Sequence, residues 1–167
     1  MRGFFAIGVE EVSKSRNLGN LMRSAHAFGA SFVFTVNANF KRRELLQADT
    51  SATIRSMPWY DYPTVDALQL PHRMQLVAVE LTDDAVELPS FRHPAQAAYI
   101  MGPERSSVSP EMMARCDHVV KIPMKFCVNV ATAGAILMYD RIQSMGYFPP
   151  RPVRPGGPVE FHGDLRY

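Results

Sequence analysis

The segment that decides the fold is residues 17–25, which read Asn17-Leu18-Gly19-Asn20-Leu21-Met22-Arg23-Ser24-Ala25. Its apolar side chains recur at helical spacing, and the flanking residues 3–9 and 31–36 are apolar, aromatic-rich runs of strand length. Asn17 stands where a helix N-cap belongs, and Gly29 follows as a C-terminal stop. The segment therefore predicts a strand–helix–strand unit, with Asn20 and Arg23 on the helix face that points away from the apolar stripe.

Strand-like and helix-like segments continue to alternate along the rest of the chain. Further strands are predicted at residues 74–80, 97–101 and 118–122, and helices at 41–48, 64–69, 109–115 and 129–145. Such alternation is typical of βαβ units, and it predicts an α/β fold with a mostly parallel sheet flanked by helices. Ligands bind such sheets at the carboxyl ends of the strands, which is where Val79, Gly102 and Ile122 fall.

Composition and length restrict the class of protein. With 167 residues, the chain is long enough for one well-buried domain and too short for two comfortable ones. Its 47% hydrophobic and 20% charged residues are typical of soluble globular proteins, and its apolar runs are too short to span a membrane. Glu10 and Glu11 close the first apolar run early, which favours a strand over a signal peptide. We expect a cytoplasmic protein without membrane contact.

Charge and cysteine content leave nucleic-acid binding open and give no sign of a metal site. The net charge of +2 is too small to demonstrate a polyanionic partner, although scattered arginines such as Arg151 and Arg154 could contact phosphates. Cys116 and Cys127 form no CxxC pair and have no histidine nearby at metal-ligand spacing. We therefore expect two reduced thiols and no bound metal.

Two later segments carry further chemistry. The first is Met101-Gly102-Pro103-Glu104-Arg105, which follows an apolar strand; its glycine leaves room for a ligand, and Glu104 could hold a loop amide or face a cationic ligand. It is not a GxGxxG sequence, so a dinucleotide site is unsupported. The second begins at Ile122-Pro123-Met124 and enters a helix near Cys127-Val128-Asn129, where small residues indicate tight packing.

In this order and spacing, the three segments resemble the motifs of the SpoU-type (TrmH-like) RNA 2′-O-methyltransferases of the SPOUT superfamily. The resemblance covers residues 4 to 147, and we expect no extra RNA-binding domain. In this respect the chain is similar to the minimal, single-domain members of the family, which include those that methylate the wobble nucleotide of tRNA. It implies an α/β sheet with a deep C-terminal trefoil knot, S-adenosylmethionine as the cofactor, tRNA as the RNA partner, and a homodimer whose interface lies beside the cofactor pocket. The knotted domain would be residues 1–147, followed by a Pro/Arg-rich tail at 148–167.

Site residues are carried over by position. The resemblance implies that the knot loops bind S-adenosylmethionine through six residues: Val79, Gly102, Ile122, Met124, Cys127 and Val128. Arg23 matches the arginine usually given a catalytic role, either as the base or, more easily in physical terms, as the group that holds the adjacent phosphate. Asn17, Glu104 and Asn129 match its partners.

Two departures from the family pattern keep alternatives open. Cys127 stands where the third motif usually begins with serine, and Ser106-Ser107 stand where the second motif continues to a glycine. One alternative is therefore a catalytically inactive knotted RNA-binding protein in tRNA or ribosome maturation. A flavodoxin-like domain that binds a small molecule would fit the periodicity, but it would explain none of the three motifs. Removal of residues 151–167 is expected to weaken RNA affinity more than cofactor affinity.

Overall fold

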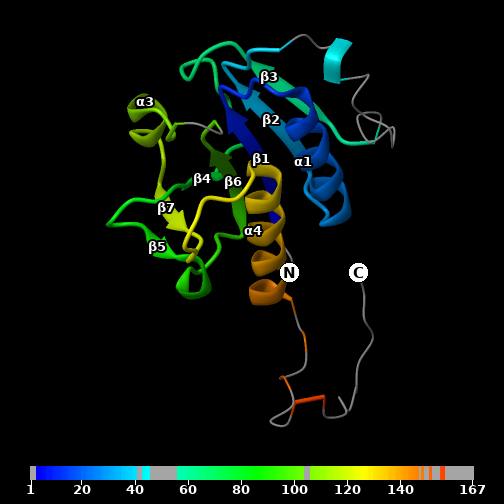
Figure 1. The fold of residues 1–167 in the computed structure, drawn as a ribbon. Coiled ribbons are helices and arrows are strands. Elements are labelled where there is room, and N and C mark those ends of the chain that lie inside the picture. Colours follow the sequence, from blue (N-terminus) through cyan, green and yellow to red (C-terminus); the bar gives the residue numbers. More distant parts are fainter. Residues whose placement is uncertain are drawn as a thin grey trace.

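The computed structural model describes residues 3–40, 43–45, 56–103, 106–146, 148, 151 and 155–156. In this part of the chain, seven strands form one sheet in the order β3-β2-β1-β6-β4-β7-β5, and every pairing between them is parallel. The predicted α/β fold with a mostly parallel sheet flanked by helices is confirmed (Figure 1). None of the described helices is both long and apolar enough to cross a membrane.

The strands lie where apolar runs predicted them, with two additions. Their bounds are β1 Phe4–Glu10, β2 Phe32–Val36, β3 Trp59–Tyr62, β4 Gln75–Val79, β5 Val86–Glu87, β6 Gln96–Met101 and β7 His118–Lys121. Strands β1, β2 and β6 are buried along almost their whole length, as expected for strands covered on both faces. The sequence did not predict β3, which stands between Pro58 and Pro63 at the sheet edge, or the two-residue β5.

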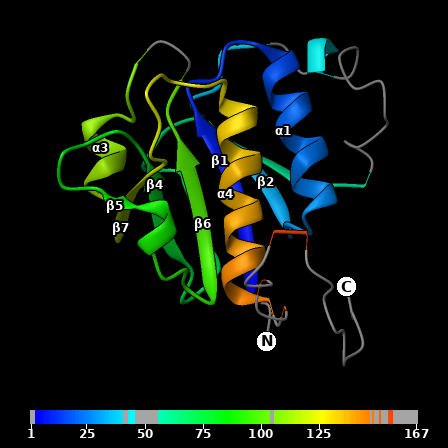
Figure 2. The same ribbon diagram turned by 60° about the horizontal axis from the view of Figure 1, so that its bottom comes forward.

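Two helices cover one face of the sheet. Helix α1 spans Ser15–Ala27 and α4 spans Val130–Met145, and they lie side by side over β1, β2 and β6 (Figure 2). The short helix α3, Pro110–Met113, packs Met112 into the core cluster on the other face. A 3₁₀ turn, η2, spans Leu88–Ser90.

The start of α1 differs from the prediction, whereas its end agrees. Asn17 is not the N-cap, because the helix begins at Ser15 after Lys14, and the Asn17 side chain is buried inside the first turn. Gly29 ends the helix with φ +77°, and the Gly29 and Ala30 amides donate to carbonyls of the last turn at 3.2 and 2.9 Å. This arrangement needs a residue that tolerates positive φ, which is why glycine stands there.

One predicted helix is wrong and one lies mostly outside the described residues. Residues 64–69 form turns: the Thr64 hydroxyl accepts from an amide three residues later, and the Arg115 guanidinium donates to the carbonyls of Val65 and Leu68. The Val65 carbonyl also accepts from the Leu68 amide at 3.1 Å, which closes a single turn and does not continue as a helix. Of the helix predicted at 41–48, only residues 43–45 are described, and they are helical.

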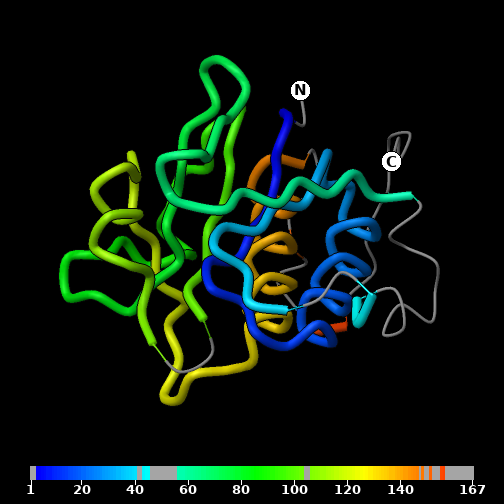
Figure 3. The backbone as a smooth tube through the Cα atoms, turned by 90° about the horizontal axis from the view of Figure 1, so that it is seen from above, coloured from blue at the N-terminus to red at the C-terminus, as the bar shows by residue number. Residues whose placement is uncertain are grey.

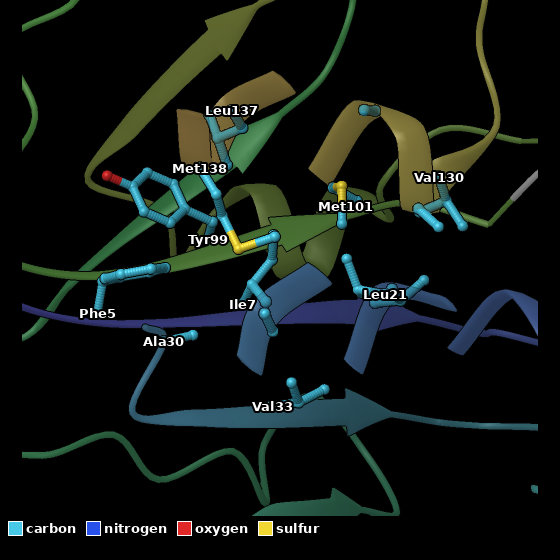
Figure 4. Close-up of a cluster of buried hydrophobic side chains, with 14 of the residues drawn as sticks. Phe5, Ile7, Leu21, Ala30, Val33, Tyr99, Met101, Val130, Leu137 and Met138 are labelled. Carbon is cyan, nitrogen blue, oxygen red and sulfur yellow. The ribbon is translucent and has the colours of Figure 1, made fainter. Parts of the chain in front are cut away.

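The main core lies between the sheet and the α1–α4 pair. Ile7, Tyr99 and Met101 point from the strands toward Leu21 of α1 and toward α4 (Figure 4). A Cβ added at Gly134 of α4 would lie 2.5 Å from the Leu21 Cδ1 atom and 3.2 Å from the Ile7 Cδ1 atom. The small residues predicted for this helix therefore let it pack directly onto α1 and β1, and they fix where its N-terminal end lies relative to the sheet.

Candidate active site

A pocket of about 360 Å³ opens at the carboxyl ends of three neighbouring strands, β6, β4 and β7. Its walls come from the segments that follow these strands and from the first turn of α4, and the segments after β6 and β7 lie next to each other (Figure 3). The lining residues are Val79, Glu80, Leu81, Met101, Gly102, Pro103, Ser106, Ser107, Ile122, Met124, Cys127, Val128, Val130 and Ala133. Such a volume is within the range of small-molecule sites, roughly 300–1,000 Å³.

All six residues that the sequence assigned to the cofactor line this pocket. Val79 is the last residue of β4, Gly102 directly follows β6, and Ile122 directly follows β7. Met124, Cys127 and Val128 belong to the link between β7 and α4, and they complete the set. The structure therefore places the second and third motifs at one site, whereas their role in binding remains a prediction.

The first motif reaches this site through a hydrogen bond between two asparagines. Asn129 is the N-cap of α4, and its Oδ1 atom accepts from the Ala131 amide at 2.9 Å. Its Nδ2 atom donates to Oδ1 of the buried Asn17 at 3.1 Å. Because both ends of the amide are engaged, the Asn129 side chain has a fixed orientation. Val128 and Val130 on either side of Asn129 line the pocket, so the asparagine pair adjoins the pocket wall, although neither asparagine lines the pocket itself.

The two remaining predicted residues have different outcomes. Arg23 is exposed on α1, on the face away from the apolar stripe as predicted, and it does not line the pocket. Glu104 lies outside the described residues. The structure thus joins Asn17 and Asn129 and leaves Arg23 on the surface of the neighbouring helix.

Sequence reasoning missed two glutamates at strand ends. Glu80 follows β4, lines the pocket, and accepts from the Val108 amide at 2.8 Å. Glu10 ends β1, is only 2% exposed, and accepts from the Ser109 amide at 2.8 Å. The available signal was a carboxylate directly at the end of an apolar strand, where a parallel sheet gathers its functional groups.

The two free thiols have different environments. Cys116 is half-buried, and burial raises its pKa to about 12, so this thiol stays protonated and unreactive. Cys127 is exposed at the pocket. Among the described residues, no group of three His, Cys, Asp or Glu side chains is arranged to hold a metal ion.

A second polar cluster lies at the opposite, amino end of the sheet. Arg141 of α4 is 1% exposed and donates to the Tyr99 hydroxyl at 2.8 Å and to the carbonyls of residues 94 and 95 at 2.8 and 3.1 Å. Tyr99 contacts Nδ1 of His93 at 2.6 Å, and Nε2 of His93 contacts Asp140 at 2.9 Å. Burial lowers the pKa of His93 and raises that of Tyr99 to about 12. A neutral His93 therefore accepts from Tyr99 and donates to Asp140.

Comparison with known proteins gives a family for this arrangement. Residues 5–139 match the model of the SpoU rRNA methylase family. The tRNA (guanosine(18)-2′-O)-methyltransferase of Escherichia coli (strain K12) is 28% identical over 141 residues, which are 79% of this chain and 60% of that protein. The enzyme of the same description from Aquifex aeolicus is 24% identical over 140 residues, 78% of this chain and 65% of its own. The chain thus spans about 60% of the length of the E. coli relative.

Solved structures share the fold. A protein described under "Structural insights into the 2-OH methylation of C/U34 on tRNA" superposes with a TM-score of 0.74 at 19% identity, covering 87% of this chain and 98% of its own. An AdoMet-bound rRNA methyltransferase from Sinorhizobium meliloti gives a TM-score of 0.74 at 21% identity, covering 86% of this chain and 57% of its own. At such identities the likeness establishes the fold.

Proposed function

This chain belongs to the SpoU rRNA methylase family, and on that premise we propose that it is an S-adenosylmethionine-dependent RNA 2′-O-ribose methyltransferase that acts on tRNA. One observation carries the proposal: the loops after three adjacent parallel strands meet in one pocket, and the Asn17–Asn129 hydrogen bond ties the first motif to its wall. This arrangement supports a single site served by all three segments that single out the family in the sequence.

The chemistry of the pocket fits this cofactor. Apolar side chains such as Val79, Ile122 and Met124 offer a surface for the adenine ring, and Glu80 supplies a negative charge that suits a cationic ligand. Gly102 leaves room for the ligand beside the loop backbone. When bound, S-adenosylmethionine supplies a methyl group on a positively charged sulfur, which is already a good leaving group.

The residues of the chain then have to position the ribose for in-line attack by its 2′-oxygen. Asn129, whose orientation Asn17 fixes, orients the ribose or the cofactor at the pocket wall. Arg23 holds the neighbouring phosphate of the RNA, because guanidinium groups bind phosphate through a planar fork and stay protonated in proteins. Positioning is thus the main contribution that we assign to the protein.

The knot is part of the proposal. We propose a trefoil knot in which α4 passes through the preceding loop. Family membership and the adjacency of the loops after β6 and β7 support it. An experimental structure traced through residues 96–145 tests this, and an unthreaded path would reject the knot without affecting the sheet order.

We also propose a homodimer formed through α4 beside the pocket. Four apolar side chains in and just before this helix are exposed, at 84% for Phe126, 40% for Val128, 39% for Ile136 and 51% for Tyr139. The double variant Ile136→Glu/Tyr139→Glu should be monomeric by light scattering, and the control Tyr60→Glu, at an equally exposed tyrosine of β3, should stay dimeric. A wild-type protein that is monomeric at all concentrations would contradict this.

The choice of tRNA is supported by the names of the relatives. The E. coli and A. aeolicus relatives are both described as tRNA 2′-O-methyltransferases, and the neighbour similar in length concerns tRNA position 34. The descriptions of the two relatives name guanosine 18 and that of the neighbour names C/U34, so we propose tRNA as the substrate and no particular nucleotide position.

Transfer of labelled methyl groups from S-adenosylmethionine to tRNA tests the function directly. With the wild type we expect label in the ribose. Arg23→Ala should lower the rate of methyl transfer by at least about a hundredfold. Arg92→Ala, at an exposed arginine near the amino end of the sheet, should keep full activity. Full transfer by Arg23→Ala would reject the role of Arg23. Cofactor and tRNA binding without transfer would favour the inactive RNA-binding alternative.

A further inference from the structure

The loop that follows β6 is held from both sides. Strand β6 lies between β1 and β4 in the sheet, and the loop between β6 and α3 supplies Gly102, Ser106 and Ser107 to the pocket. Each neighbouring strand has a glutamate at its carboxyl end, Glu10 for β1 and Glu80 for β4, and both carboxylates accept hydrogen bonds from this loop.

Glu10 binds the far end of the loop. One of its oxygens accepts from the Ser109 amide at 2.8 Å, and the other accepts from the Ser109 hydroxyl at 2.5 Å. The same hydroxyl accepts from the Met112 amide at 3.1 Å, which makes Ser109 the N-cap of α3. Glu10 does not line the pocket, so it can influence a ligand only through the loop.

Glu80 binds the loop one residue earlier. One carboxylate oxygen accepts from the Val108 amide at 2.8 Å, and the other accepts from the Leu81 amide at 2.9 Å. The loop folds back so closely that the Val108 nitrogen lies 2.7 Å from the position of a Cβ at Gly102. The absence of a side chain at Gly102 permits this approach, and Glu80 fixes the amide that makes it.

We infer that Glu10 and Glu80 are positioning residues that keep the loop after β6 folded over the cofactor pocket. The inference rests on the proposed function, because it assigns the loop to S-adenosylmethionine. The two carboxylates fix consecutive amides, Val108 and Ser109, from opposite sides of β6. Ser106 and Ser107, which precede these amides, are thereby held at the pocket wall.

Hydrogen exchange of the ligand-free protein tests the contacts without reference to function. Glu80→Gln should speed exchange of the Val108 amide by about tenfold or more, and Glu10→Gln should do the same for Ser109, since hydrogen bonds to a charged partner are among the stronger ones. Glu111→Gln is the matched control, because Glu111 is exposed on α3 directly after the same loop. Unchanged exchange of both amides in both variants would overturn the inference.

Binding and kinetics test the consequence. Both variants should bind S-adenosylhomocysteine about tenfold more weakly and raise the cofactor KM, with kcat near the wild-type value at saturation. A merely structural role would instead lower the active fraction, and with it kcat, at unchanged KM; that result would overturn the inference. If Glu10→Gln fails to fold, the half-buried Glu80 still provides the test.

The two proposals fail separately. A wild-type protein that binds neither S-adenosylhomocysteine nor S-adenosylmethionine would reject the proposed function and, with it, the assignment of the loop to that cofactor. Faster amide exchange with unchanged cofactor affinity would reject only the positioning role, because the pocket would then bind its ligand regardless of the loop.

Discussion

The two ends of α4 serve different purposes. At its C-terminal end, Arg141 is 1% exposed and bonded to Tyr99 and to two backbone carbonyls. At its N-terminal end, the N-cap Asn129 and, in the preceding link, Cys127 are exposed beside an open pocket. One helix is thus fixed at the amino edge of the sheet and presents its other end to a ligand. The comparison suggests that substitutions at the fixed end change stability, whereas substitutions at the open end change binding.

The largest expected effect is at the fixed end. Arg141→Met would leave the Pro94 carbonyl without its donor, and it would remove one bond each from the Ala95 carbonyl, which still accepts from the Phe4 amide, and the Tyr99 hydroxyl, which still contacts His93. It would also remove the cationic group that lies 5.0 Å from the centre of the Phe5 ring. Hydrogen bonds to a charged group contribute about 1.5–3 kcal/mol each, so the loss of the guanidinium bonds should lower the free energy of unfolding by about 3 kcal/mol or more. Urea denaturation measures it, with Arg92→Met as the exposed control. A loss below about 1 kcal/mol would contradict the distinction between the two ends.

The next effect is at the open end. In Gly102→Ala, the added Cβ would meet the Val108 nitrogen at 2.7 Å and the Ser107 carbonyl carbon at 2.9 Å. Both are backbone atoms, so the loop has to open. We expect S-adenosylhomocysteine affinity to fall by about tenfold or more, with the unfolding free energy less affected than in Arg141→Met. Calorimetric titration measures this affinity. Gly29→Ala is the control: a Cβ at Gly29 would meet nothing within 4 Å, but φ there is +77°, so this substitution should lower stability and leave the affinity unchanged.

We expect a pH effect at the fixed end. Burial lowers the pKa of His93 below its ordinary value of 6.5, so the unfolded chain binds this proton more readily than the folded one. The stabilising contribution of neutral His93 is therefore complete above pH 6.5 and declines as the pH falls through the lowered folded-state pKa. Urea midpoints measured downward from pH 7.5 should show this slope in the wild type and lose it in His93→Asn. The exposed His118 provides the control His118→Asn.

The smallest effect concerns Cys127. A thiol is a weaker hydrogen-bond partner than a hydroxyl, so Cys127→Ser should bind S-adenosylhomocysteine about threefold more tightly and leave stability unchanged. A tenfold weaker affinity would show that the pocket is adapted to sulfur at this position. Cys116→Ser is the matched control, because that thiol packs with the other face of the sheet.

The sequence predicted best where one physical rule acts alone. Apolar runs predicted β1, β2, β4, β6 and β7, and the rule that parallel sheets bind ligands at their carboxyl ends placed Val79, Gly102 and Ile122 at the pocket. Asn17 was misassigned because capping and tertiary bonding use the same amide group, and only the fold decides which one occurs.

Other features depend on contacts between distant residues. Nothing in the sequence marks Arg141 as buried, because its burial depends on the Pro94 and Ala95 carbonyls, which accept from it across 47 and 46 positions. Glu10 likewise finds Ser109 across 99 positions. No local sequence pattern predicts such long-range pairs. A carboxylate at the end of an apolar strand does, however, indicate a candidate functional residue.

The order of the strands also bears on how the chain is made. Phe4 pairs with Gln96 through the contact between β1 and β6, so a strand completed early lies next to one that leaves the ribosome much later. Until then β1 has an open edge, and unpaired apolar edges are sites of aggregation. Pairings so distant in sequence also fold slowly. During its synthesis, this protein should therefore depend on chaperones for longer than a domain built from hairpins would.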